Sequence, residues 1–210
     1  MHSDESTLPD DIDDLLLVSG YRDDGSLDSF ITERLSDPTA RRRVLALRAA
    51  CRRHLVTNDF WRRALNDDDD DVRREALTLI AQAPLLDESI FALLVAALSD
   101  DDVLVVDGAV FALGEHLYTP ANDALIAVAT QHEDARCRES AIAALGAIGD
   151  DRARPAILAA LDDKPAVRRR AIVALANFEG PDIEAALERA REDRDWQVRA
   201  AVDQLGRGEE

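Results

Sequence analysis

The sequence is poor in aromatic residues and in long apolar runs, and each shortage excludes a class of protein. Aromatic residues make up 4% of the chain, which suits a core of small aliphatic side chains. No apolar run reaches the roughly 18 residues that a membrane-spanning helix requires. The first residues, MHSDESTLPDDIDD, are acidic and lack the basic and apolar regions of a signal peptide. We therefore expect a cytoplasmic protein without a membrane partner.

Lysine is nearly absent, and the charge is strongly negative. Lys164 is the only lysine among 25 basic residues, 30 of the 43 acidic residues are aspartate, and the formal net charge is −18. An Asp-rich, lysine-poor surface is expected of a protein from a high-salt cytoplasm, where salt screens self-repulsion. GC-rich coding would produce the same preference for arginine over lysine, so both origins stay open.

A short motif recurs through the chain. Residues 65–77 read LNDDDDDVRREAL, and similar runs are LDDKPAVRRRAIVALA from Leu161 and AREDRDWQVRAAVDQL from Ala190. The position before the recurring arginine is occupied in six copies by Arg42, Val72, Val105, Cys137, Val167 and Val198. These positions are 30, 33, 32, 30 and 31 residues apart, which indicates a tandem repeat.

Each repeat contains two amphipathic segments around an acidic loop. In the second segment apolar residues recur at helical spacing, as in Val72, Ala76, Leu79 and Ile80. Aspartates stand at the start of this segment, where a carboxylate caps free amide groups and interacts favourably with the helix dipole. Because a helical hairpin cannot bury its apolar face alone, we expect the hairpins to stack on their neighbours.

The repeats resemble HEAT repeats, and in particular the short HEAT-like type of bilin lyases and many prokaryotic proteins. The runs that carry the resemblance are DDDDDVRREAL, DKPAVRRRAIVAL and DARCRESAIAAL. The resemblance implies an all-α fold, a right-handed α-solenoid of about six HEAT-like helical hairpins. We expect the solenoid at 26–206, with repeats at about 26–57, 58–87, 88–118, 119–149, 150–179 and 180–206.

Residues 1–25 are expected to form an acidic N-terminal extension, partly disordered or folded as a capping helix. The segment DIDDLLLVSGY at 11–21 is the candidate for that helix. Terminal repeats need a cap on their exposed apolar side. We expect Leu15, Leu16 and Leu17 to cover the first repeat.

The resemblance also implies a structural role for one arginine in each repeat. In HEAT repeats this arginine pairs with loop aspartates in a ladder along the stack. We therefore expect it to stabilise the stack rather than to bind a ligand. The arginines at this position are Arg43, Arg73, Arg138, Arg168 and Arg199, and Val106 interrupts the series in the third copy.

The two cysteines and the aspartate run at 67–71 are expected to be structural. Cys51 and Cys137 lie about three repeats apart, and because solenoid contacts are mostly between neighbours we expect no disulfide. An EF-hand loop needs Gly at its sixth position and Glu at its twelfth, where this run has Val72 and Thr78. We predict no metal and no cofactor, although helix capping alone does not explain five aspartates in a row.

The charge is unevenly distributed, which bears on the partner rather than on the fold. Residues 34–64 contain nine arginines and two acids, whereas residues 75–135 contain eleven acids and no base. We predict a monomeric, non-catalytic protein-binding scaffold whose concave second-helix face and acidic middle repeats bind a partner with a basic patch. The candidate contact residues on that face are Arg74, Glu75, Asp107, Glu139, Arg169 and Arg170.

Nucleic-acid binding is one alternative. It needs several cations along one track, and the acidic remainder of the chain would repel a duplex. A simpler alternative is that the acidic N-terminal tail, with Asp10, Asp11, Asp13 and Asp14, folds over the basic residues. The basic cluster that would have to carry this function is Arg41, Arg42, Arg43, Arg52 and Arg53.

Catalysis is not expected. HEAT-like deoxyhypusine hydroxylases, which this chain resembles in fold, hold iron through several His-Glu dyads, but only His132-Glu133 forms such a pair here. No nucleophile elbow or Gly-rich phosphate loop is present. We therefore expect no catalytic residue. A bilin-lyase-like role in handling a chromophore follows from the resemblance alone and is a second alternative.

Overall fold

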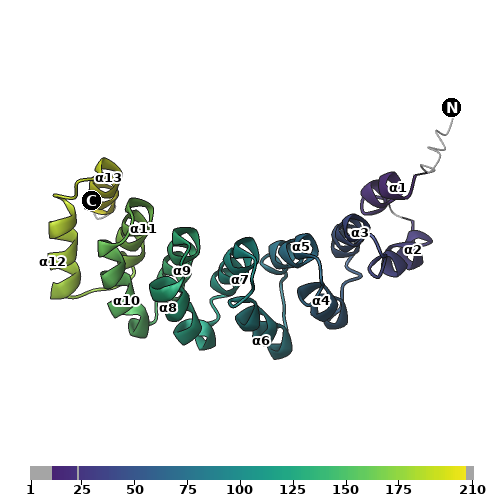
Figure 1. The fold of residues 1–210 in the computed structure, drawn as a ribbon, viewed down its shortest axis with the longest axis horizontal. Coiled ribbons are helices and arrows are strands. Elements are labelled where there is room, and N and C mark those ends of the chain that lie inside the picture. Colours follow the sequence, from purple (N-terminus) through teal and green to yellow (C-terminus); the bar gives the residue numbers. More distant parts are fainter. Residues whose placement is uncertain (1–10, 23, 207–210) are drawn as a thin grey trace. The chain divides into compact units, whose positions relative to one another are not determined.

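The computed structural model describes residues 11–22 and 24–206, and the regular structure of these residues is entirely helical (Figure 1). The predicted all-α class is confirmed. None of the described helices is both long and apolar enough to cross a membrane. The α-helices are α1 (Ile12–Ser19), α2 (Leu27–Arg34), α3 (Ala40–Arg52), α4 (Asn58–Leu65), α5 (Asp70–Ile80), α6 (Glu88–Ala97), α7 (Val103–Glu115), α8 (Asn122–Gln131), α9 (Ala135–Ile148), α10 (Arg154–Ala159), α11 (Pro165–Leu175), α12 (Pro181–Ala190) and α13 (Trp196–Gly206), with short 3-10 helices η1 (Thr119–Ala121), η2 (Asp151–Ala153) and η3 (Ala160–Asp162).

The described residues form two compact units, and the boundary between them falls inside α6, between Ile90 and Phe91. In the first unit α3 packs against α1, α2 and α5, and α5 also packs against α4. The helices α1 and α5 lie on opposite sides of α3 (Figure 1). The helix α1 therefore covers the side of α3 that faces away from the next hairpin.

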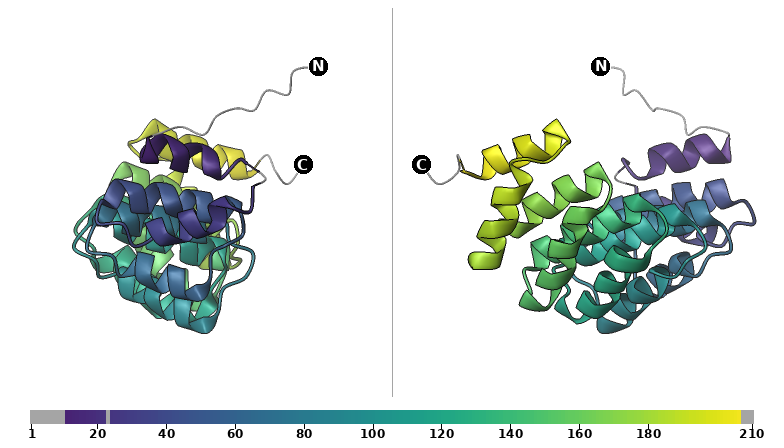
Figure 2. Two further views of the ribbon diagram at one scale, coloured as in Figure 1. Left: turned by 90° about the vertical axis from the view of Figure 1, so that its right-hand side faces the viewer. Right: turned by 60° about the vertical axis from the view of Figure 1, so that its left-hand side comes forward.

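In the second unit the second helices of successive hairpins stack in chain order. The helix α7 packs on α9, α9 on α11 and α11 on α13 (Figure 2). The helix α8 packs against α9, and α10 packs against α11. Each hairpin thereby buries its apolar side chains against its neighbours, as stacked repeats must. We use the term second helices for α3, α5, α7, α9, α11 and α13.

The acidic loops start the second helices. The Asp102 carboxylate accepts hydrogen bonds from two amides in the first turn of α7, both at 3.0 Å. Asp69 and Asp134 cap α5 and α9, each by accepting one amide of the first turn. These bonds satisfy amide groups that have no partner inside the helix. The helix α9 ends at Gly149, whose φ of 68° is left-handed backbone that favours glycine.

The core consists of small aliphatic side chains that recur at helical spacing. In α9 the side chains of Cys137, Ala141, Ile142 and Leu145 are all 0% exposed. The corresponding face of α7 is equally buried, with Leu113 at 0% exposure. Burial of each leucine or isoleucine of this kind stabilises the fold by about 2 kcal/mol, which explains why few aromatic residues are needed.

Two glycines let the second helices approach each other closely. A Cβ on Gly146 would lie 2.5 Å from the Cβ and 2.8 Å from the Cα of Ala174. A Cβ on Gly114 would lie 2.9 Å from the Cβ of Ala144. The Asn177 side-chain amide fastens the first of these contacts by donating to the Gly146 carbonyl at 2.8 Å. A side chain larger than hydrogen does not fit at either glycine without a shift of the neighbouring helix.

The N-terminal helix α1 covers the first hairpin with a narrower face than the sequence predicts. Leu16 is 1% exposed and packs in a cluster with Leu45 and Ala46, and Leu15 packs near α2 and α3. Leu17 is 46% exposed, so the prediction that it covers the first repeat is wrong. Consecutive helical residues point about 100° apart, and three in a row cannot share one apolar face. Residues 1–10 of the predicted extension lie outside the described residues.

Candidate interaction surface

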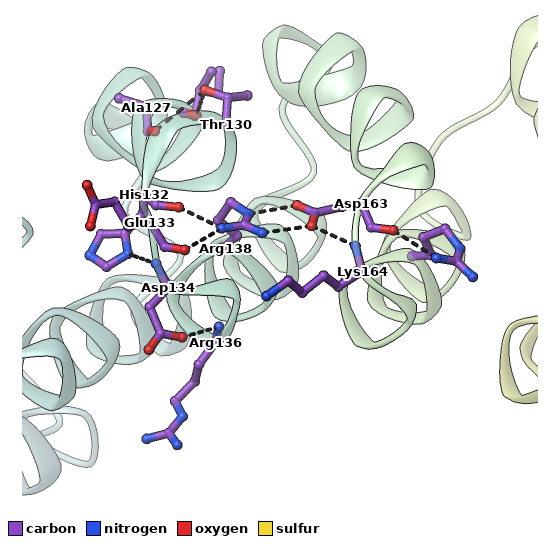
Figure 3. A network of polar contacts seen from close by, with 11 residues as sticks. Ala127, Thr130, His132, Glu133, Asp134, Arg136, Arg138, Asp163 and Lys164 are labelled. Carbon is purple, nitrogen blue, oxygen red and sulfur yellow. Dashed lines mark hydrogen bonds and ion pairs between the residues drawn. The ribbon is translucent and has the colours of Figure 1, made fainter. Parts of the chain in front are cut away.

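Arg138 of α9 shows how one hairpin is joined to the next (Figure 3). Its Nε and Nη2 donate to the two carboxylate oxygens of Asp163, each at 2.7 Å. Its Nη1 donates to the carbonyls of His132 and Glu133 in its own loop, at 2.7 and 2.9 Å. Asp163 also accepts from the Lys164 amide at 2.6 Å, and the Arg138 guanidinium holds the pKa of Asp163 below its usual value. We call this arrangement a rung.

Two further rungs have the same geometry. Arg43 donates from Nε and Nη2 to Asp67 at 2.8 and 2.6 Å in the first unit. Arg168 donates from the same two atoms to Asp193, both at 2.8 Å, in the second unit. Arg168 is 4% exposed, so Asp193 neutralises a guanidinium that is almost fully removed from water. That guanidinium in turn holds the pKa of Asp193 below its usual value.

Arg73 and Arg199 hold their own loops as the other ladder arginines do. Arg73 Nη1 donates to the Asp67 carbonyl at 2.8 Å, and Arg199 Nη1 donates to the Asp193 carbonyl at 2.6 Å. Val106, which takes the arginine position in α7, is 1% exposed and joins the apolar core. The ladder position thus serves to fix the loop between the two helices of a hairpin.

The aspartates of the run Asp67–Asp71 have different structural roles. Asp67 accepts the ladder arginine of α3 and also the Asp69 amide at 3.0 Å. Asp69 in turn accepts from the Asp71 amide at 3.0 Å, which starts α5. Asp70 and Asp71 both form ion pairs with Arg74. In residues 11–22 and 24–206 no group of three or more His, Cys, Asp or Glu side chains is arranged to hold a metal ion.

Asp13 fastens α1 to the basic cluster. Its carboxylate accepts from Arg41 Nε at 3.1 Å and from Arg42 Nε at 2.9 Å. The hydrogen bond from Arg42, followed by the one from Arg41, holds the pKa of Asp13 below its usual value. The acidic N-terminal segment therefore lies over part of the cluster.

The remaining arginines of the basic cluster also have partners within the first unit. Arg53 donates to Asp28 at 2.7 Å and to the Asp24 carbonyl at 3.0 Å, and Arg52 lies over the ring of Tyr21 with its guanidinium carbon 4.4 Å from the ring centre. Arg43 forms the rung described above. The cluster consequently presents fewer free cations than the sequence suggests.

The second helices α7 and α9 enclose a groove whose floor consists of small side chains. Its volume is about 260 Å³. The ring of Phe111 stands at its edge and is 55% exposed, which is uncommon for a phenylalanine. We call this feature the Phe111 groove, and it is lined by Phe111, Gly114, Glu115, Glu139, Ser140, Ala143, Ala144, Ala147 and Arg170.

The charged groups around the Phe111 groove differ in how far they are already paired. Glu139 lies 3.5 Å from Arg170 and 3.8 Å from Arg169, measured between guanidinium nitrogen and carboxylate oxygen. Asp107 accepts a hydrogen bond from a serine hydroxyl of α9. Glu115 is exposed and has no hydrogen-bond or ion-pair partner in the part of the chain that the structure describes. Glu115 is therefore the carboxylate at this groove that is available to a ligand.

The six predicted contact residues fall into two groups. Asp107, Glu139, Arg169 and Arg170 come together on the second helices of the second unit. Arg74 and Glu75 lie in the first unit on α5. There Glu75 accepts from Arg48 at 2.8 and 2.6 Å, and Arg74 is paired with the aspartates at the start of its own helix.

Sequence patterns alone did not point to Phe111 and Glu115. The predicted contacts came from the positions directly after the ladder arginine, whereas these two residues lie one and two turns further along α7. A signal for Phe111 exists in the repeat alignment. The equivalent place, six residues after the buried valine or cysteine, holds Thr78, Ala143 and Val173 in other repeats. An aromatic ring at a solvent-facing position is an interface signal.

His132 and Cys137 have structural surroundings. His132 Nδ1 accepts a hydrogen bond from the Asp134 amide at 3.1 Å, within the turn that precedes α9. The Cys137 thiol lies 3.5 Å from the Val103 carbonyl oxygen, and burial raises its pKa to about 11. A thiol with so high a pKa is a poor nucleophile near neutral pH. Both cysteines of the chain are free.

Comparison with known proteins agrees with this architecture. Residues 122–206 match the family described as HEAT repeats. The structure of the YibA protein of Escherichia coli has a TM-score of 0.64 and 18% identity, with 90% of this chain and 71% of that one covered. An engineered protein has a TM-score of 0.65 and 18% identity, with 87% and 95% covered. No curated protein sequence matches the chain.

A designed armadillo repeat protein in complex with the peptide (KR)4 is also similar in structure. Its TM-score is 0.62 at 16% identity, and the likeness covers 87% of this chain and 99% of that protein. At such identities the likeness shows the fold alone. The predicted α-solenoid of HEAT-like hairpins is thereby confirmed, while the bilin-lyase resemblance stays a prediction.

Proposed function

We propose that the protein is a non-catalytic scaffold that binds a basic segment of a partner protein in the Phe111 groove. The observation that carries this proposal is an exposed aromatic ring, Phe111, one helical turn from Glu115, a carboxylate without a partner among the described residues of the chain. A partner arginine or lysine would place its charge on Glu115 and lay its aliphatic stem against the ring.

The charge around the groove supports a basic ligand. Residues 75–135 contain eleven acids and no base, which attracts cationic segments and speeds their encounter. The designed armadillo repeat protein in complex with (KR)4 offers a precedent for a protein of similar fold that binds a basic peptide. We place the protein in a reducing, cytoplasmic setting, because both cysteines are free and one is buried in the core.

The test is a titration of fluorescein-labelled (KR)4 into the full chain, followed by fluorescence anisotropy at about 0.15 M salt. Replacing Phe111 by Ala removes the exposed ring and should weaken binding about tenfold, since aromatic anchors carry much of an interface's affinity. Replacing Glu115 by Gln removes the free carboxylate and should weaken binding about threefold, with a smaller salt dependence.

Matched controls separate the groove from general acidity. Leu104 is another exposed apolar side chain of α7, and Asp101 is an exposed acid in the loop before this helix. Neither residue lines the groove. We expect Leu104→Ala and Asp101→Asn to change the affinity by less than about twofold. Equal losses in the control and groove variants would show that (KR)4 binds to the net charge and not to the groove.

A further inference from the structure

The last ladder arginine among the described residues is Arg199 on α13. Arg138 and Arg168 each use Nη1 to hold their own loop and Nε with Nη2 to hold an aspartate of the next hairpin. Arg199 makes the first of these contacts, from Nη1 to the Asp193 carbonyl at 2.6 Å. Its Nε and Nη2 have no partner among residues 11–22 and 24–206. The guanidinium is therefore anchored as in a rung, while no described residue occupies its carboxylate-binding edge.

The rungs of this chain define what would fill that edge. In each case the acceptor is an aspartate that precedes a second helix and also accepts an amide of its own loop. Asp67 accepts from the Asp69 amide, and Asp193 accepts from the Asp195 amide at 2.7 Å. Both carboxylate oxygens face the two parallel N–H groups of the arginine, which is the strongest geometry for such a pair.

The surroundings of Arg199 are those of an interface. Trp196, one turn before Arg199 on α13, is 66% exposed. Ala200, next to Arg199, is small and half-buried, so it allows a helix to approach closely. Tryptophan and arginine are the residues that most often dominate interface energies. Trp196 and Arg199 both belong to α13, and neither lines the Phe111 groove.

We propose that this surface of α13, defined by Trp196 and Arg199, docks a different polypeptide through the aspartate that leads one of its helices. The partner's carboxylate completes the rung on Arg199, and its apolar side chains cover Trp196. We commit to a different polypeptide because Asp67, Asp163 and Asp193 are already held by arginines within the chain. Asp37 accepts the Thr39 amide at 2.9 Å and lies 3.7 Å from Arg34, so it is the aspartate through which a second copy would bind, and the sedimentation test below addresses that outcome.

A helical hairpin with the right aspartate is available as a probe. A synthetic peptide with the sequence of residues 180–206 contains α12, α13 and the aspartate that serves as rung acceptor inside the chain. The labelled peptide is titrated into the full chain and followed by anisotropy. The Asp193→Asn peptide is its control, because asparagine keeps the loop cap but loses the charge. Arg199→Gln is the test variant of the protein, and Arg194→Gln, a nearby exposed arginine, is the control variant.

We expect Arg199→Gln and the Asp193→Asn peptide each to weaken binding about tenfold, and the two together to weaken it little further, since both remove one interaction. Arg194→Gln should bind like the unchanged protein. If the free peptide does not form its hairpin, the same 27 residues joined after Gly206 report the same coupling through thermal unfolding. Equal behaviour of Arg199→Gln and Arg194→Gln in both formats would overturn the proposal.

Two further readouts distinguish docking of a different polypeptide from self-association and from binding in the Phe111 groove. Sedimentation of the full chain alone should show no self-association that depends on Arg199. Such an association would mean that a second copy supplies the carboxylate, and would overturn the proposal. Binding of (KR)4 should be the same in the Arg199→Gln variant and the unchanged protein. The proposals for the Phe111 groove and for the α13 surface are therefore tested separately.

Discussion

The second helices of the two units use equivalent positions in opposite ways. Six residues after the buried apolar position of α7 stands Phe111, which is exposed to solvent one turn from Glu115, and Glu115 has no partner within 11–22 and 24–206. The corresponding residue on α3 is Arg48, whose guanidinium donates two hydrogen bonds to Glu75 of the next hairpin, at 2.8 and 2.6 Å. At this position the first unit pairs its charge internally, whereas the second unit leaves a ring and a carboxylate exposed for a partner.

The connections between hairpins do not share this difference. Arg43 and Asp67 in the first unit form the same two-pronged contact as Arg138 and Asp163 in the second. Stability therefore rests on the loops and the apolar faces, and the exposed face of the second helices is free to vary. Recognition by this fold is a property of individual surface positions and cannot be taken from the repeat itself.

The largest expected effect is the loss of a rung. Replacing Arg168 by Ala leaves Asp193 without its partner in a nearly buried site, and should lower the free energy of unfolding by about 3 kcal/mol. Urea denaturation followed by circular dichroism measures this. Arg169, whose side chain is 41% exposed and 3.8 Å from Glu139, is the matched control, and its replacement by Ala should cost less than about 0.5 kcal/mol. Equal losses would mean that the rung does not stabilise the stack.

A bulky group between the second helices should have the next largest effect. Gly146→Ala places a methyl group 2.5 Å from the Ala174 Cβ and should destabilise the protein by about 2 kcal/mol, because the neighbouring helix must move. Gly25→Ala serves as control, since nothing lies within 4 Å of its added Cβ. Thermal unfolding compares the two variants. If Gly146→Ala were as stable as Gly25→Ala, the close approach of α9 and α11 would not be a requirement of the fold.

Much of the fold could be predicted because its signals are local and repeat. The helix starts follow from aspartates in the loops, and the ladder arginines follow from one position in a regular period. The partners in space could not be predicted in the same way. Asp13 meets Arg41 and Arg42 only because α1 packs on α3, and no periodicity predicts which face of an isolated first helix is buried. The exposure of Phe111 likewise depends on the small alanines that stack beside it.

The third prediction tests whether α1 keeps the basic cluster of the first unit from binding nucleic acid. Asp13→Asn removes the charge that holds Arg41 and Arg42, and should tighten binding of a labelled single-stranded oligonucleotide about threefold at low salt. Asp14→Asn changes the net charge equally, but the described contacts give its side chain no bond to the cluster, so it should leave affinity nearly unchanged. Anisotropy measures both. Equal affinities of the two variants would show that Asp13 does not mask the basic cluster.

The smallest expected effect concerns the ends of two second helices. At the end of α7 the Leu117 amide donates a hydrogen bond to the Gly114 carbonyl at 3.0 Å, and the Tyr118 amide donates one to the Leu113 carbonyl at 3.1 Å. This ending forces Leu117 to a φ of 47°, in the left-handed region that favours glycine. Leu117 is 56% exposed, so little apolar burial is lost when it is replaced. We expect Leu117→Gly to stabilise the protein by about 0.5–1 kcal/mol in thermal unfolding.

The first unit supplies the comparison for this change. His54 ends α3 at a φ of 57°, with its own amide donating to the Cys51 carbonyl at 3.1 Å. Histidine enters the left-handed region more readily than leucine does, so His54→Gly relieves less strain and should stabilise less than Leu117→Gly. A destabilised Leu117→Gly variant would show that the leucine side chain contributes more through its contacts than its backbone costs. The end of α7 would then be specific to the second unit and not a feature that both units share.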